Sequence, residues 1–145
     1  MQTKINETPN GNENKASKKN KIIYWSLTGL VAAGFLMSSF MYLGKSPELM
    51  ENFRKAGFPV FFVSILGLAK FLGAIAIVNP WFPKLKEWAY AGFTFVLIGA
   101  IWTHAATSTS VVAPLVFLIL VGASYFFYGK MSTTDRNLKA NYVSV

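Results

Sequence analysis

The sequence contains no cysteine at any of its 145 positions. This absence excludes disulfide bonds, thiolate metal sites, iron–sulfur clusters and dithiol redox chemistry. Charged residues are also scarce, at 14% of the chain against 53% for hydrophobic residues. These proportions differ from those of ordinary soluble domains and indicate a membrane protein whose main partner is the lipid bilayer.

Acidic residues are fewer than basic ones, with 6 Asp and Glu against 14 Lys and Arg. The basic residues lie mostly in the tails and in the loops that border apolar runs. Such a distribution is typical of topology signals and contacts with anionic lipids, and it argues against nucleic acid as a partner.

Four apolar runs are each long enough to cross a bilayer. The clearest one, residues 60–78, is apolar except for Ser64 and Lys70. A helix of this length measures about 28 Å, which matches the hydrocarbon core of a membrane. The predicted spans are residues 22–43, 60–78, 88–106 and 111–128. The sequence therefore predicts an all-α fold, an integral membrane four-helix bundle.

The segments outside the spans are polar. Residues 1–21 form a basic tail and residues 129–145 a tail of mixed charge, and we expect both to be disordered because they have little apolar surface to bury. Residues 44–59 carry apolar side chains on one side only. With Ser46 as the expected N-cap and Gly57 as the stop, they predict a short amphipathic helix at the membrane surface.

The charge bias predicts the orientation of the bundle. Ten Lys and Arg residues lie on the side that holds both termini, and three lie in the loops on the other side. Both termini should therefore be cytoplasmic. The aromatic residues at that boundary are expected to form an interfacial belt, and they include Tyr24, Trp25, Trp81, Trp88, Tyr90 and Tyr128. Small residues at near-helical spacing predict close helix contacts, namely Gly29 with Ala33, Ala69 with Gly73, and Gly92 with Gly99.

Lys70 is the candidate residue that most needs an explanation. It lies roughly 15 Å from the outer end of its helix, where an ionised lysine costs at least about 2.5 kcal/mol. No Asp or Glu occurs in any span. The nearest groups by depth are Ser38, Ser39, Thr94 and Trp102. Three roles stay open: a structural lysine bonded to hydroxyls and carbonyls, an anchor for an anionic or carbonyl-bearing ligand, and a partner for a carboxylate on another subunit.

His104, the single histidine, falls near the outer end of the third span. It either forms a structural hydrogen bond to Tyr42 or a loop carbonyl, or it handles protons or contacts a quinone. The candidate ligand-binding residues are Lys70, His104, Trp102, Ser38, Ser39 and Tyr42. No nucleophile–base pair, paired carboxylates or metal cluster is recognisable, so we expect no catalytic or metal site and no catalysis by this chain alone.

A set of short motifs in order along the chain resembles a known family. The motifs are YLGK at 42–45, FRKAGFP at 53–59, GLAKFLGAIAIV at 67–78, EWAYAGF at 87–93, GA..TH at 99–104 and SYFFYG at 124–129. Together they resemble the DoxX-like family of small four-helix membrane proteins. The family's relatives are associated with membrane oxidoreductases, including quinone-linked sulfur oxidation.

The resemblance implies an accessory or scaffold subunit of a membrane oxidoreductase assembly, in the bacterial cytoplasmic membrane. Quinone is the one cofactor that it brings into consideration, and a homo-oligomer also stays open. The alternative is a protein that binds or transports a quinone, lipid or hydrophobic anion through a cavity around Lys70.

Overall fold

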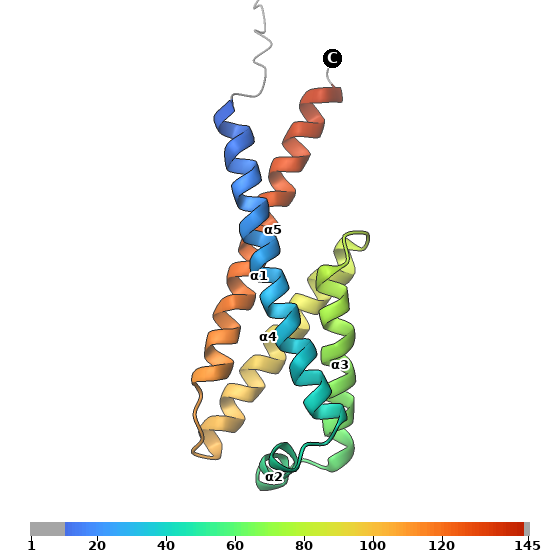
Figure 1. The fold of residues 1–145 in the computed structure, drawn as a ribbon, viewed down its shortest axis with the longest axis vertical. Helices are drawn as coiled ribbons and strands as arrows, with labels where there is room; N and C mark the ends of the chain where they lie inside the picture. Colours follow the sequence, from blue (N-terminus) through green and yellow to red (C-terminus); the bar gives the residue numbers. More distant parts are fainter. Residues whose placement is uncertain (1–10, 144–145) are drawn as a thin grey trace, which may run out of the picture.

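The described part of the chain is a set of helices joined by short turns. The computed structural model describes the backbone of residues 11–143 and the side chains of residues 15–137 and Ala140. Its helices are α1 (Gly11–Leu43), α2 (Pro47–Lys55), α3 (Val60–Val78), α4 (Pro83–Ala106) and α5 (Val112–Val143) (Figure 1). All of them except α2 contain a stretch that is long and apolar enough to cross a membrane. The predicted all-α four-helix membrane bundle, with a short helix between its first two spans, is confirmed.

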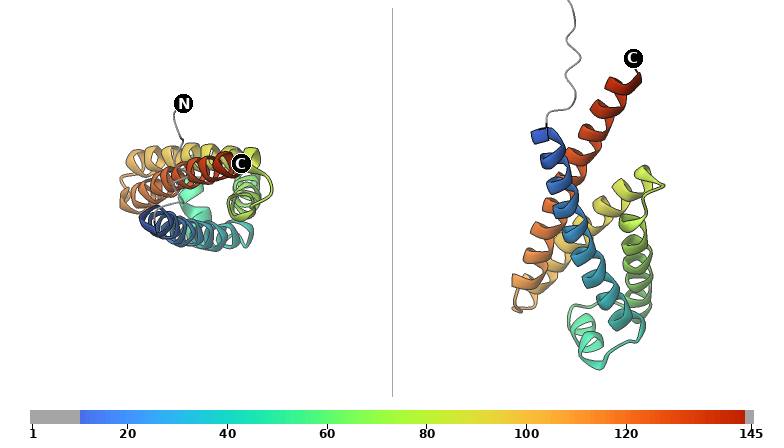
Figure 2. Two further views of the ribbon diagram at one scale, coloured as in Figure 1. Left: turned by 90° about the horizontal axis from the view of Figure 1, so that it is seen from above. Right: turned by 45° about the horizontal axis from the view of Figure 1, so that its top comes forward.

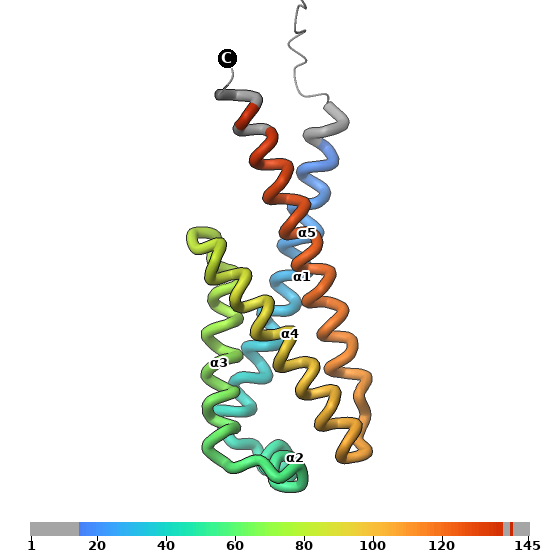
Figure 3. The backbone as a smooth tube through the Cα atoms, turned by 180° about the vertical axis from the view of Figure 1, so that it is seen from behind, coloured from blue at the N-terminus to red at the C-terminus, as the bar shows by residue number. Residues whose placement is uncertain are grey.

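The four long helices pack as a ring. Helix α1 contacts α3 and α5, and α4 contacts the same two helices from the opposite side. Neighbours in the ring run antiparallel (Figure 1). Helices α3 and α4 meet at one end and diverge toward the other (Figure 3). Viewed along the long axis, α2 lies beneath the space that the long helices surround (Figure 2).

Helices α1 and α5 extend beyond the predicted spans. Helix α1 begins at Gly11 and α5 continues to Val143, which corrects the expected disorder of residues 11–21 and 129–143. Once an apolar span has nucleated a helix, each further residue adds a backbone hydrogen bond, so polar segments without proline can continue it. The remaining parts of the expected tails, residues 1–10 and 144–145, lie outside the described residues.

The amphipathic helix α2 has the predicted ends. Pro47 lies in its first turn, and at its C-terminus the Phe58 amide donates to the Phe53 carbonyl at 2.9 Å. Gly57 allows this turn because its φ is +78°, a backbone conformation that costs glycine little. Ser46 holds the N-cap position as expected, but its side chain makes no capping hydrogen bond. Helix α2 packs on α3 and covers the end of the bundle.

Apolar side chains form the core where the long helices cross. The buried cluster joins α1, α3, α4 and α5 and includes Val31, Phe35, Ile77, Phe93, Leu97 and Val121. The rings of Phe35 and Phe93 stack across the ring of helices, with 3.7 Å between their centroids. This stack fills the centre of the bundle.

The expected close helix contacts are present only in part. A Cβ at Gly73 would lie 2.7 Å from the Phe93 ring, so α3 and α4 approach closely there. Three of the predicted contact glycines, Gly29, Gly92 and Gly99, have open space where a Cβ would be. Helical spacing shows which residues share a face, but not whether that face meets a helix or lipid. A close approach of α1 and α3 occurs instead at Gly67, where a Cβ would lie 2.9 Å from the Tyr42 Cβ.

We predict that Gly67→Leu destabilises the bundle while Gly29→Leu does not. The added side chain at Gly67 would have to push α1 away, and such overpacking typically costs about 1–3 kcal/mol. Thermal unfolding in detergent, followed by circular dichroism, should show a lower Tm for Gly67→Leu only. Equal Tm values for the two variants would contradict the contact.

Candidate functional site

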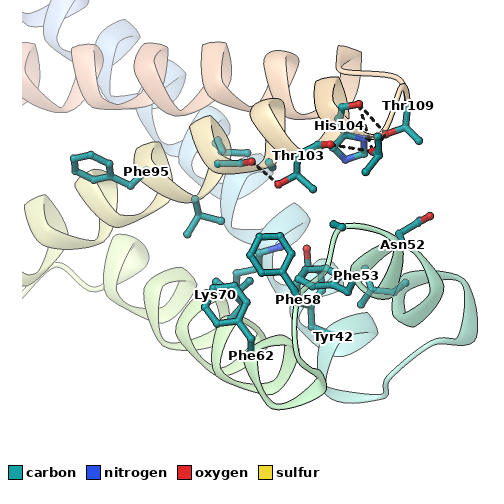
Figure 4. A pocket seen from close by; sticks show the side chains of 18 of the residues that line it. Tyr42, Asn52, Phe53, Phe58, Phe62, Lys70, Phe95, Thr103, His104 and Thr109 are labelled. Carbon is teal, nitrogen blue, oxygen red and sulfur yellow. Dashed lines mark hydrogen bonds between the residues drawn. The ribbon is translucent and has the colours of Figure 1, made fainter.

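A cavity of about 480 Å³ lies between α3 and α4, with α2 across its end (Figure 4). This volume is typical of sites that hold a small molecule. Most of the wall is apolar, and its aromatic members are Phe35, Tyr42, Phe53, Phe58, Phe62 and Phe95. The apolar side of α2 thus faces the cavity, and Leu49 and Phe53 of that side contribute to the lining.

Lys70 reaches this cavity from α3 and is buried, with 8% of its surface exposed. Its Nζ donates to the Ser38 Oγ at 3.1 Å and lies 3.6 Å from the centre of the Tyr42 ring. A hydroxyl oxygen and the face of an aromatic ring both attract a cation. Among the described residues, the one ion pair joins Glu51 and Lys55 on the exposed side of α2. The charge of Lys70 is therefore solvated by polar groups but not neutralised by a described carboxylate.

The two serines of α1 have separate roles, although both were predicted site residues. Ser38 accepts the hydrogen bond from Lys70. Ser39 is fully buried and donates to the Gly67 carbonyl at 2.7 Å, so it joins α1 to α3. Consecutive residues on a helix point about 100° apart, which explains why only one of them reaches the lysine.

His104 lines the far wall of the cavity, opposite Lys70 (Figure 4). Its Nδ1 lies 2.8 Å from the Thr109 Oγ1, in place of the predicted bond to Tyr42 or a loop carbonyl. The predicted residue Trp102 lies outside the cavity, with 79% of its surface exposed. The fold therefore brings Lys70, Tyr42 and His104 to one cavity, with Ser38 behind the lysine.

This arrangement is suited to holding a molecule. It combines apolar walls with a cation at mid-depth and a histidine–threonine pair at one end. No group of three or more His, Cys, Asp and Glu side chains that could hold a metal ion occurs among the described residues.

Comparison with known proteins gives the family. The model of the DoxX-like family matches residues 26–124, which include every residue that lines the cavity. The chain belongs to the DoxX-like family. No curated protein and no solved structure matched it. Family membership and the four apolar helices together identify a multi-pass membrane protein.

This DoxX-like protein has a second buried lysine, which lies between the predicted spans 60–78 and 88–106. Lys86 is 4% exposed, and its Nζ donates to the Tyr24 hydroxyl at 2.8 Å. Helix α4 begins at Pro83, five residues before the predicted span. Lys86 therefore lies within the helix, on its buried side. The signal in the sequence is that Lys86 lies on the same helical face as Tyr90, Phe93 and Leu97, but only the packing of the helices shows that this face is buried.

Tyrosines expected in an interfacial belt are instead part of the interior of the DoxX-like protein. Tyr24 and Tyr90 are buried. The Tyr90 hydroxyl lies 2.7 Å from the Ser124 Oγ, which lies 2.8 Å from the Thr28 Oγ1. These hydroxyls connect α1, α4 and α5, and along α1 the Phe35–Phe93 stack separates them from the cavity. The lysine and the hydroxyls thus form a polar junction of three helices.

We predict that Tyr24→Phe destabilises the DoxX-like protein, because it removes the acceptor for a buried ammonium group. Leaving a buried charged donor without its partner costs about 1–3 kcal/mol or more. Tyr128→Phe is the matched control, since Tyr128 also lies near Lys86, at 5.2 Å from ring centre to Nζ, but its hydroxyl bonds no other described residue. A Tm lowered by Tyr24→Phe and unchanged by Tyr128→Phe is expected, and the reverse order would refute the assignment.

Proposed function

We propose that this DoxX-like protein binds a small amphiphile in the cavity between α3 and α4. The ligand would have an apolar body and an anionic or carbonyl-bearing head group. The observation that carries the proposal is Lys70, a buried ammonium on the wall of an apolar cavity, with no described carboxylate within ion-pair distance.

Electrostatics supports this choice of ligand. A lysine near the middle of a membrane-spanning helix costs at least about 2.5 kcal/mol on insertion. A ligand oxygen at Lys70 would recover part of that cost, and the phenylalanines would cover an apolar body. A quinone, a lipid and a hydrophobic anion share this chemistry.

The cavity favours binding over transport. Phe35 closes its inner end and stacks on Phe93, so the space does not continue toward the polar junction at Lys86. We place the protein in the bacterial cytoplasmic membrane with both termini in the cytoplasm, because Lys and Arg are concentrated at the end that holds them.

We predict that Lys70→Met weakens ligand binding about tenfold or more, equivalent to about 1.4 kcal/mol. The probes are a fluorescent palmitate, with an anionic head, and decylubiquinone, with a carbonyl head. Binding is measured by titration of the purified protein in detergent, and the probe that loses affinity identifies the head group. Lys84→Met is the control, because Lys84 is exposed at the opposite end of the bundle.

Folding of the Lys70→Met protein is checked by its Tm, which should equal or exceed that of the wild type because an unneutralised buried charge is gone. If the wild type binds neither probe, or if Lys70→Met binds both as the wild type does, the proposal fails.

A second proposal is the scaffold role in a membrane oxidoreductase assembly. It is supported by a row of exposed aromatic side chains on α4, formed by Trp88, Phe95 and Trp102. Their spacing of seven residues places them on one face of the helix, where another membrane helix could pack.

The combined change Trp88→Ala and Trp102→Ala should then remove oxidoreductase subunits that co-purify with the wild type in mild detergent. Recovery of the wild type alone, or as a homo-oligomer without other subunits, would count against this role.

A further inference from the structure

The cavity wall reaches the outer surface of the bundle. Phe95 lines the cavity, yet 76% of the surface of this residue is exposed. It lies near the middle of α4, at the depth where a bilayer contains hydrocarbon rather than water. Phe95 therefore belongs both to the cavity wall and to the outer surface of the bundle.

A second residue on α4 leaves space at the same place. Gly99 lies one helical turn beyond Phe95 and also lines the cavity. A Cβ at Gly99 would meet no atom within 4 Å. On the facing side, Phe62 and Leu66 of α3 line the cavity and are themselves only partly buried. The divergence of α3 and α4 toward α2 (Figure 3) accounts for this space.

We propose that the cavity opens laterally into the bilayer between α3 and α4, at Phe95 and Gly99, and that its ligand is a single-chain amphiphile that enters from the lipid. This inference rests on the proposed function and deepens it, because it identifies the ligand as a membrane-resident molecule. The ligand's head group lies at Lys70, and its chain extends past Phe95 into the surrounding hydrocarbon.

Depth and polarity agree with this arrangement. Lys70 and Phe95 both lie near the middle of their helices, so a chain that leaves the cavity past Phe95 stays within the hydrocarbon layer. The chain loses no contact with apolar surroundings when the ligand binds, while the head group gains Lys70, which lines the cavity. A water-soluble ligand would instead enter near His104 and Thr109, at the polar end of the cavity.

Gly99→Trp tests the opening, with Gly92→Trp as the matched control. Gly92 lies two turns earlier on the same face of α4 and is also beside open space, but it does not line the cavity. The probe is palmitate with a diazirine next to its carboxylate, supplied in the bilayer of nanodiscs that contain the full-length protein. After illumination, mass spectrometry measures the label at Tyr42 and Lys70.

We expect Gly99→Trp to lower this labelling about tenfold and Gly92→Trp to leave it unchanged. Phe95→Ala widens the opening and should increase the initial labelling rate severalfold, which decides the question even if Gly99→Trp does not fold. Wild-type labelling of Gly99→Trp, or an unchanged rate for Phe95→Ala, overturns the lateral opening.

The two proposals fail in different ways. If Lys70→Met abolishes the labelling at Tyr42 while Gly99→Trp does not affect it, the binding site stands and the lateral opening is wrong. If the wild type is not labelled at all, the single-chain amphiphile is excluded, and the proposed function fails with it only if decylubiquinone also does not bind.

Discussion

Two ammonium groups are buried in this bundle, and no described carboxylate lies within ion-pair distance of either. Lys70 is solvated by Ser38 and the ring of Tyr42, and Lys86 by the hydroxyl of Tyr24. All three partners belong to α1. Tyr24 and Tyr42 are 18 residues apart, which is five helical turns, so they lie on the same face. The need to solvate two buried cations therefore fixes α1 against α3 at one end and against α4 at the other.

The two lysines have the same kind of partner but different surroundings. Lys86 is packed beside a cluster of hydroxyls that joins α1, α4 and α5, and this polar group holds the helices together. Lys70 faces a cavity of about 480 Å³, so part of its surroundings is left to whatever occupies that space. The stacked rings of Phe35 and Phe93 keep the two regions apart. Lys86 thus stabilises the packing of the helices, whereas Lys70 lies where a molecule in the cavity could contact it.

Family membership explains the membrane fold, whereas the proposed function rests on the cavity. Membership of the DoxX-like family accounts for the four spans and for the membrane. The proposed function rests on local features: the cation at Lys70, the phenylalanine-rich wall, helix α2 across one end, and the exposed wall residue Phe95. These features suit a molecule that is itself dissolved in the membrane. Under this proposal the bilayer would be both the solvent of the protein and the source of its ligand.

Much of the fold follows from the sequence alone. The span at residues 60–78 has no polar face, so only a membrane helix fits it, and Pro47 and Gly57 bound α2 through backbone geometry that few other residues allow. The same logic singled out Lys70, because a charge inside an apolar run needs partners wherever it lies. Which partners it finds, and that Lys86 is buried while Trp102 faces outward, was decided only by the tertiary structure. Periodicity along one helix groups residues into faces, but the packing of neighbouring helices determines which face meets protein and which meets lipid.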